Sequence, residues 1–284
     1  MTTTAARQRA ARLLGQPVVS AEPLGGGDIA QTSRMRLADG RMVVVKTLPD
    51  APPGFFAAEA RGLEVLRVAG APPVPEVLAV ADDLLVLTHV APGPPTPRAA
   101  TEFGAALARL HTAECPGFGA PADGYIATLP LDNTPAPTWA EFYMARRIEP
   151  YARAARAAGR LDARDAADLV VLAPRLVERV PDEPPARLHG DLWSGNVLWG
   201  KGSRAWLIDP AAHGGHRESD LAMLALFGVP HLGRILKAYD EAAPLAAGWR
   251  DRVGIHQLFP LLVHALLFGG GYGARAAATA RALA

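Results

Sequence analysis

Three polar side chains in the second half of the chain have the types and spacing that phosphoryl transfer requires. Asp191 and Asn196 lie five positions apart within residues 187–199, and Asp209 follows an apolar run thirteen positions after Asn196. Transfer from Mg-ATP to a hydroxyl needs an acceptor for the hydroxyl proton and hard oxygen ligands for the metal. We expect Asp191 to accept the proton, and Asn196 and Asp209 to bind Mg²⁺. Because an Asp and an Asn at this spacing are common by chance, the interpretation depends on the rest of the chain.

Three consecutive glycines, Gly25, Gly26 and Gly27, lie between two segments with strand-like sequence, residues 18–24 and 31–37. Glycine lets the backbone approach a ligand closely, and its free N–H groups can meet phosphate oxygens. The same glycines also fit a flexible surface turn, which is the more common explanation for such a run alone. A phosphate-binding loop therefore needs support from other residues.

A lysine and a glutamate nearby could provide that support. Lys46 ends the apolar run 43–45, where an inward-facing ammonium is costly to bury without an anion. Residues 55–69 have apolar side chains at helical spacing and carry Glu59, the natural partner in a lysine–glutamate pair that holds ATP phosphates. The alternative is that Glu59 is a solvated helix charge and that Lys46 is a charged residue that protects the end of a strand.

The order of elements predicts an α+β protein with two lobes, because strand patterns come first and helical patterns follow. The strand patterns, which predict a five-stranded antiparallel sheet with one helix, cover residues 18–24, 31–37, 41–48, 75–80 and 84–90. The helical patterns that follow cover residues 96–112, 139–158, 162–180, 221–227, 232–241 and 249–268. The proline-rich segment 91–95 predicts the boundary between an ATP-binding lobe (residues 1–92) and a mainly helical catalytic and acceptor-binding lobe (93–284). Residues 115–138 are expected to form an irregular surface excursion.

Composition excludes several classes of partner. The 284 residues carry 29 Lys and Arg against 28 Asp and Glu, so no net field draws in nucleic acid or an anionic membrane. Residues 1–14 lack a signal-peptide core, and the longest apolar run, residues 259–268, is too short to span a bilayer. Cys115 is the only cysteine, which fits a reducing compartment. We therefore expect a cytoplasmic protein without membrane or nucleic-acid partners.

Taken together, these segments resemble the fructosamine kinase (ketosamine-3-kinase) family, which shares the protein-kinase-like fold with aminoglycoside phosphotransferases. The resemblance covers nearly the whole chain. The residues that carry it are 25–29, 56–60, 139–142, 189–196 and 217–222, with Lys46, Asp209 and Pro210. His-Gly-Asp followed by Asn196 fits any member of the wider superfamily. The tetrad Leu192, Trp193, Ser194 and Gly195 is similar to the fructosamine kinase version in particular.

The resemblance implies a role for each part of a nucleotide site. Gly25 to Gly27 would cover the phosphates, Lys46 would contact them and pair with Glu59, and Asp191 would be the base. The residues that would line the adenine site are Thr88, His89 and Val90. Asp220 would brace the catalytic loop through backbone hydrogen bonds. Thr88 departs from the acidic residue that many relatives have there, and the glycine run lacks the cysteine through which some relatives form an intersubunit disulfide.

For the acceptor, the resemblance implies binding by Trp193, His213 and His216. The indole of Trp193 offers a flat apolar surface to a sugar or its amine substituent, although a core aromatic is the alternative. His213 and His216 follow Asp209 in a glycine-rich loop, where a histidine is as often only a loop residue.

The implied activity is an ATP- and Mg²⁺-dependent kinase that phosphorylates a sugar hydroxyl of a free or protein-bound ketosamine, in a monomer or homodimer. The family product is unstable, so the implied role is repair of glycated amines. Two alternatives stay open: an aminoglycoside-type or other small-molecule phosphotransferase, and a nucleotide-binding pseudokinase. A protein kinase is disfavoured, because only ten residues separate Asp209 from Asp220 and leave little room for an activation loop.

Overall fold

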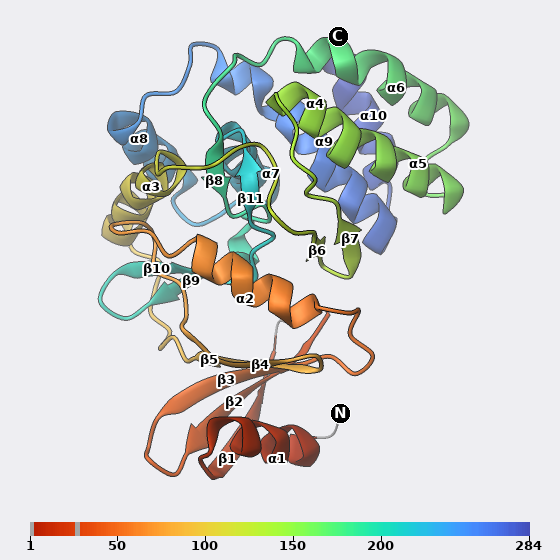
Figure 1. Ribbon diagram of the computed structural model, residues 1–284. Helices are drawn as coiled ribbons and strands as arrows, with labels where there is room; N and C mark the ends of the chain where they lie inside the picture. The colour runs from red at the N-terminus through yellow and green to blue at the C-terminus, as the bar shows by residue number, and fades with distance from the viewer. Residues whose placement is uncertain (1–2, 26–28) are drawn as a thin grey trace.

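The computed structural model describes residues 3–25 and 29–284, and Gly26 and Gly27 of the predicted phosphate loop lie outside these ranges. A five-stranded antiparallel sheet forms the N-terminal lobe in the order β1-β2-β3-β5-β4 (Figure 1). Its strands are β1 (Val18–Leu24), β2 (Gln31–Leu37), β3 (Met42–Thr47), β4 (Val77–Ala81) and β5 (Leu84–Thr88). The predicted sheet and α+β class are confirmed.

A helix covers each face of this sheet. Alternate side chains of a strand point to opposite faces, so Val43 and Val45 pack in a core under α1 (Thr3–Leu14). Leu85 and Leu87 of the neighbouring strand point the other way, toward α2 (Phe55–Val65). Lys46 follows Val45 on β3, so the same alternation directs its side chain to the α2 face, which is the face that meets the second lobe.

The two lobes share one core beneath α2, which we call the central core. It contains Phe56 and Leu63 of α2 together with Phe103 and Leu207 from the second half of the chain. All four side chains are at most 2% exposed. The apolar face of α2 is therefore buried by both lobes at once.

The connection between the lobes is hydrogen-bonded to a hairpin made of β9 (Val197–Gly200) and β10 (Arg204–Leu207). The Gly93 N–H donates to the Trp199 carbonyl at 2.7 Å, and the Lys201 N–H donates to the Ala91 carbonyl at 3.0 Å. A Cβ atom at Gly93 would lie 2.5 Å from the Gly200 carbonyl oxygen, so only glycine fits this close approach. The predicted boundary near residue 92 falls in a segment fixed to the second lobe.

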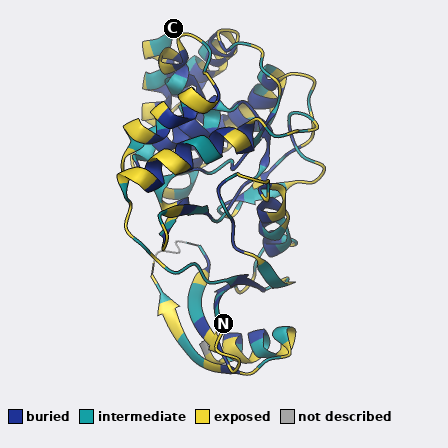
Figure 2. Ribbon diagram, turned by 90° about the vertical axis from the view of Figure 1, so that its left-hand side faces the viewer, coloured by how far each residue is buried: buried dark blue, intermediate teal, exposed yellow. Residues whose placement is uncertain are grey.

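The second lobe is mainly helical, as predicted, and is built around the twenty-residue helix α9. In Figure 2, buried residues lie along the middle of this lobe, and exposed ones lie on the outer faces of its helices. Its elements are α3 (Pro97–His111), α4 (Trp139–Tyr143), a π-helical turn (Met144–Ile148), α5 (Glu149–Ala157), α6 (Ala163–Val177), α7 (Glu218–Phe227), α8 (Leu232–Ala242), α9 (Trp249–Phe268) and α10 (Tyr272–Leu283). Among the described residues, no helix has both the length and the apolar run that crossing a bilayer demands.

Residues 115–138 differ from the expected irregular excursion. They contain a short antiparallel hairpin, β6 (Gly124–Ile126) and β7 (Leu129–Leu131), which lies between α2 and the helical lobe (Figure 1). Its strands have three residues each, too few to show the alternation by which a strand is recognised in a sequence. A second short pair, β8 (Ala186–Leu188) with β11 (His213–Gly215), flanks the loop that carries Asp191 and Asn196.

Candidate active site

Asp220, in the first turn of α7, holds the loop that follows β8. Its carboxylate accepts hydrogen bonds from the His189 N–H at 2.7 Å and the Gly190 N–H at 3.0 Å. His111 Nε2 lies 3.2 Å from the same carboxylate. Burial alone would raise the pKa of Asp220, but the hydrogen bond with His111 and the backbone donors outweigh it and lower the pKa. Asp220 is therefore an ionised, buried acceptor around which the loop is built.

His189 joins this loop to the strand segment before Asp209. Its Nδ1 accepts from the Asp191 N–H at 3.2 Å, so the proton of the neutral ring is on Nε2. Nε2 donates to the Ile208 carbonyl at 2.8 Å. Burial lowers the pKa of His189, which keeps the ring neutral in this bridge. Neither His189 nor His111 is among the site residues predicted from the sequence; His189 lies inside the motif, whereas His111 is remote from it and has no sequence signal.

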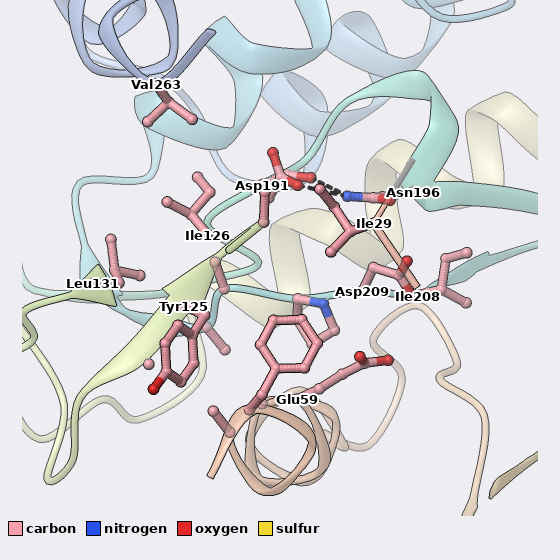
Figure 3. Close-up of a pocket in the computed structure, with 18 of the residues that line it drawn as sticks. Ile29, Glu59, Tyr125, Ile126, Leu131, Asp191, Asn196, Ile208, Asp209 and Val263 are labelled. Carbon is pink, nitrogen blue, oxygen red and sulfur yellow. Dashed lines mark hydrogen bonds between the residues drawn. The ribbon is translucent and has the colours of Figure 1, made fainter. Parts of the chain in front are cut away.

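Asp191 and Asn196 lie against each other in the loop (Figure 3). The Asn196 amide Nδ2 donates to the Asp191 carbonyl at 2.8 Å and to Asp191 Oδ2 at 2.9 Å. Burial raises the pKa of Asp191 to about 7, the Asn196 hydrogen bond opposes the shift, and the negative charge of Asp209 adds to it. A carboxylate whose pKa is close to neutral pH suits the exchange of a proton with a substrate hydroxyl.

Lys46, on β3, forms ion pairs with two carboxylates, those of Glu59 and Asp209. Its Nζ lies 2.7 Å from each Glu59 carboxylate oxygen and 2.9 Å from Asp209 Oδ1. Lys46 and Glu59 are buried, whereas the Asp209 side chain is 43% exposed toward the cavity. Burial would lower the pKa of Lys46, but the charges of Asp209 and Glu59 outweigh it and raise the pKa. The lysine is therefore charged, and the structure places it where the sequence predicted a lysine–glutamate pair.

The donor set suits a hard divalent cation. The Asn196 amide nitrogen is used by Asp191, which leaves the amide oxygen as the group available to a ligand. Asp209 offers a partly exposed carboxylate that lines the same cavity. Oxygen ligands of these two kinds are those that Mg²⁺ takes in phosphoryl-transfer sites.

One cavity of about 720 Å³ is lined by Lys46, Glu59, Asp191, Asn196 and Asp209. It runs from Lys46 and Asp209 past Asp191 to an apolar end on α7, α9 and α10. The side chains at that end are Trp193, Phe227, Val263, His264, Leu267, Phe268 and Tyr272. The Trp193 ring meets Phe227 edge to face at 6.4 Å, and a Cβ at Gly195 would lie 2.4 Å from the indole. Gly195 therefore gives Trp193 the space to lie along the cavity wall beside Asp191.

The structure does not bring His213 or His216 to this cavity, contrary to our expectation. His213 lies on β11, is buried, and contacts the Ala211 carbonyl through Nδ1 at 2.8 Å. Burial lowers the pKa of His213 to about 3, with the charge of Arg147 adding to it, so the ring is neutral at physiological pH. The sequence predicted only a glycine-rich loop here, because the pairing of β11 with β8 is long-range.

His216 belongs to a separate buried group with Glu218 and His256, three side chains close enough to one another to suggest a metal site. His216 Nδ1 accepts from the Glu218 N–H at 3.2 Å, which places the ring proton on Nε2. Arg252 already donates to both Glu218 oxygens. Because His216 carries a ring proton and Arg252 occupies the Glu218 carboxylate, we interpret this group as a structural network of hydrogen bonds and ion pairs and not as a metal site.

The residues predicted to contact adenine lie at the end of β5 and just beyond it. Thr88 Oγ1 accepts from the Glu76 N–H at 2.9 Å, and the His89 N–H donates to the Met42 carbonyl at 3.3 Å. Thr88, His89 and Val90 are not among the residues that line the 720 Å³ cavity. Their contact with adenine stays a prediction, as does phosphate binding by Gly25, which is described at the end of β1.

The sheet, the shared core and the braced loop define the class of protein as a kinase-like phosphotransferase. An ADP-bound aminoglycoside phosphotransferase has the same fold, with a TM-score of 0.63 over 98% of each chain at 12% identity. At that identity the likeness shows the fold alone. Within this class, sequence defines the family.

The chain belongs to the fructosamine kinase family, whose sequence model matches residues 1–283. A Thermobifida fusca protein, solved by crystallography and assigned as a fructosamine-3-kinase, is 48% identical and has a TM-score of 0.90 over 99% of both chains. The probable ketoamine kinase of Thermus thermophilus is 37% identical over 88% of each sequence. The chloroplastic protein-ribulosamine 3-kinase of Arabidopsis thaliana is 32% identical over 88% of this chain and 78% of its own length.

Proposed function

We propose that this protein is an ATP- and Mg²⁺-dependent kinase that phosphorylates a sugar hydroxyl of a ketosamine. The observation that carries the proposal is the placement of Asp191, whose pKa is about 7, between a lysine–carboxylate group and an aromatic acceptor end of one cavity. The names of the relatives, ketoamine kinases and a ribulosamine 3-kinase, support the substrate class.

In the proposed mechanism each side chain performs one task. Asp191 accepts the proton of the acceptor hydroxyl as the oxygen attacks, and Asn196 orients that carboxylate through Nδ2. Lys46, fixed by Glu59, contacts the nucleotide phosphates. Mg-ATP supplies the phosphoryl group and charge neutralisation when bound, held by Asn196 and Asp209.

The acceptor end favours a ketosamine over a polycationic aminoglycoside. The seven side chains at that end carry no carboxylate; among the described lining residues of the whole cavity, the carboxylates beyond Glu59, Asp191 and Asp209 are those of Glu64 and Asp123. Trp193 offers an apolar face next to Asp191. A polycation needs several anions around it, because desolvated ammonium groups are costly without partners. A sugar with an apolar amine substituent has no such need and can stack on the indole.

The test is Mg-ATP turnover against free fructosamine and ribulosamine, a glycated protein and a panel of aminoglycosides. We expect ketosamines to be preferred by kcat/KM. Preference for an aminoglycoside would overturn the proposed substrate class. Absence of turnover with every acceptor, despite nucleotide binding, would favour the pseudokinase alternative.

A further inference from the structure

The β6–β7 hairpin joins the two cores of the molecule through neighbouring residues. Tyr125 and Ile126 are adjacent on β6, so their side chains point to opposite faces. Tyr125 packs against the central core, which contains α2, whereas Ile126 and Leu131 belong to the core of the helical lobe. Figure 3 shows Tyr125 directed toward the helix that carries Glu59, and Ile126 directed the other way.

Two hydrogen bonds and one ring contact connect the hairpin to α2. The Tyr125 hydroxyl donates to the Pro53 carbonyl, just before the helix, at 3.0 Å. The Tyr125 and Phe55 rings are 5.4 Å apart. Two residues beyond Glu59, Arg61 Nη2 donates to the Asp123 carbonyl at 3.2 Å. These contacts lie on both sides of Glu59 along the helix and restrain its position.

The other side of the hairpin is fixed to the helical lobe. The Tyr151 hydroxyl donates to the Pro130 carbonyl at 2.8 Å. The guanidinium of Arg147, 1% exposed, donates at 2.6 Å to the Asp132 carbonyl and to Asn133 Oδ1. Buried, charge-assisted hydrogen bonds of this kind are strong, so the hairpin is a firm support.

We propose that Tyr125 is a positioning residue for the phosphate-binding group: through the hairpin it holds α2 where Glu59 keeps Lys46 extended into the cavity. The chain of contacts is continuous, from Arg147 through the hairpin to Pro53 and Phe55, then along α2 to Glu59 and Lys46. The inference rests on the proposed function only in taking ATP as the nucleotide.

The first test is a double-mutant cycle between Tyr125→Phe and Glu59→Gln, read as the dissociation constant of a nonhydrolysable ATP analogue with Mg²⁺. Tyr125→Phe removes the hydroxyl and keeps the ring. We expect affinity to fall about two- to twelvefold, the scale of one hydrogen bond. In the Glu59→Gln background the same substitution should change affinity by a factor near one. If the two factors multiply instead, Tyr125 acts independently of Glu59 and the proposal is overturned.

The control is Tyr143→Phe, on α4, which also removes a tyrosine hydroxyl that donates to a backbone carbonyl, that of Ile255 at 2.8 Å, and which additionally removes the acceptor of the Phe259 N–H at 3.3 Å. It should leave nucleotide affinity unchanged even if it lowers the melting temperature. An equal loss of affinity in both variants would mean that general destabilisation explains the effect.

A second measurement does not depend on substrate identity. Amide hydrogen exchange of residues 55–65 should be faster in Tyr125→Phe than in wild type or Tyr143→Phe. Unchanged exchange in this helix would contradict the proposal. If no ketosamine is phosphorylated, the proposed function fails, while the exchange data still decide whether the hairpin positions α2.

Discussion

The two ends of the cavity are built from different kinds of interaction. At the nucleotide end, Lys46, Glu59 and Asp209 form an ion-paired group, and the loop with Asp191 is fixed by Asp220. At the acceptor end, aromatic and aliphatic side chains such as Phe268, 53% exposed, supply shape and few polar contacts. Directional bonds demand particular residue types at particular positions, whereas an apolar wall tolerates several side chains of similar size. We infer that chemistry is encoded at the first end and acceptor choice at the second.

The largest effect is expected at the nucleotide end. Asp209→Ala removes an anionic oxygen ligand that no neutral neighbour replaces, so turnover should fall below detection. Nucleotide binding with Mg²⁺ should weaken much more than binding of metal-free ATP, measured by calorimetry. If metal-dependent binding is the same as in wild type, the assignment of Asn196 and Asp209 to the cation is wrong.

Asp191→Asn tests the base with the next largest effect. The amide keeps the size of the carboxylate but cannot accept the proton, so kcat should fall at least about a hundredfold. ATP affinity should stay nearly unchanged, because the proposed role is confined to the proton. An equal loss of ATP affinity would assign Asp191 to the metal or to folding instead.

At the acceptor end, Trp193→Ala should raise the acceptor KM or lower acceptor-dependent turnover by about 1 to 3 kcal/mol while leaving the ATP constant nearly unchanged. A core tryptophan would behave differently: its truncation would cost about 3 to 5 kcal/mol of stability and damage both constants. Two-substrate kinetics and thermal melting on this variant separate the two. Lower stability with an unaltered acceptor preference would contradict stacking.

The smallest effect is a pH dependence. Burial raises the pKa of Asp191 to about 7, and the base must be ionised to act, so acceptor kcat/KM should rise with pH up to about 7 and level off above it. The bound cation would move the midpoint lower, because positive charge favours the carboxylate. Stability should have the opposite sign: because the carboxyl pKa is raised from 3.8 to about 7 in the folded protein, the protonated group stabilises the fold at low pH, and this contribution is lost as pH rises through about 7. A profile flat from pH 5 to 8 would contradict the role of Asp191.

The sequence predicted the parts of the fold whose signal is local. The apolar run before Lys46 and the helical spacing around Glu59 each predicted an element that the structure contains. The spacing of Asp191 and Asn196 likewise reflects a bond between them. These features need only neighbours in sequence.

Features that depend on distant partners could not be predicted. His111 is 109 residues from Asp220, and no periodic pattern links the two. His213 is buried because β11 pairs with β8, a contact between short strands without a signal of their own. The β6–β7 hairpin was not predicted for the same reason, since its residues are buried by the lobes on either side of it.

The central core has a consequence for how the molecule can be divided. Phe56 and Leu63 are covered by Phe103 and Leu207, so a fragment ending near residue 92 would expose an apolar face to water. The two lobes are therefore expected to melt in one cooperative transition and to aggregate when expressed separately. For the same reason, chimaeras that exchange lobes between family members should fold only when the residues on both sides of this core are exchanged together.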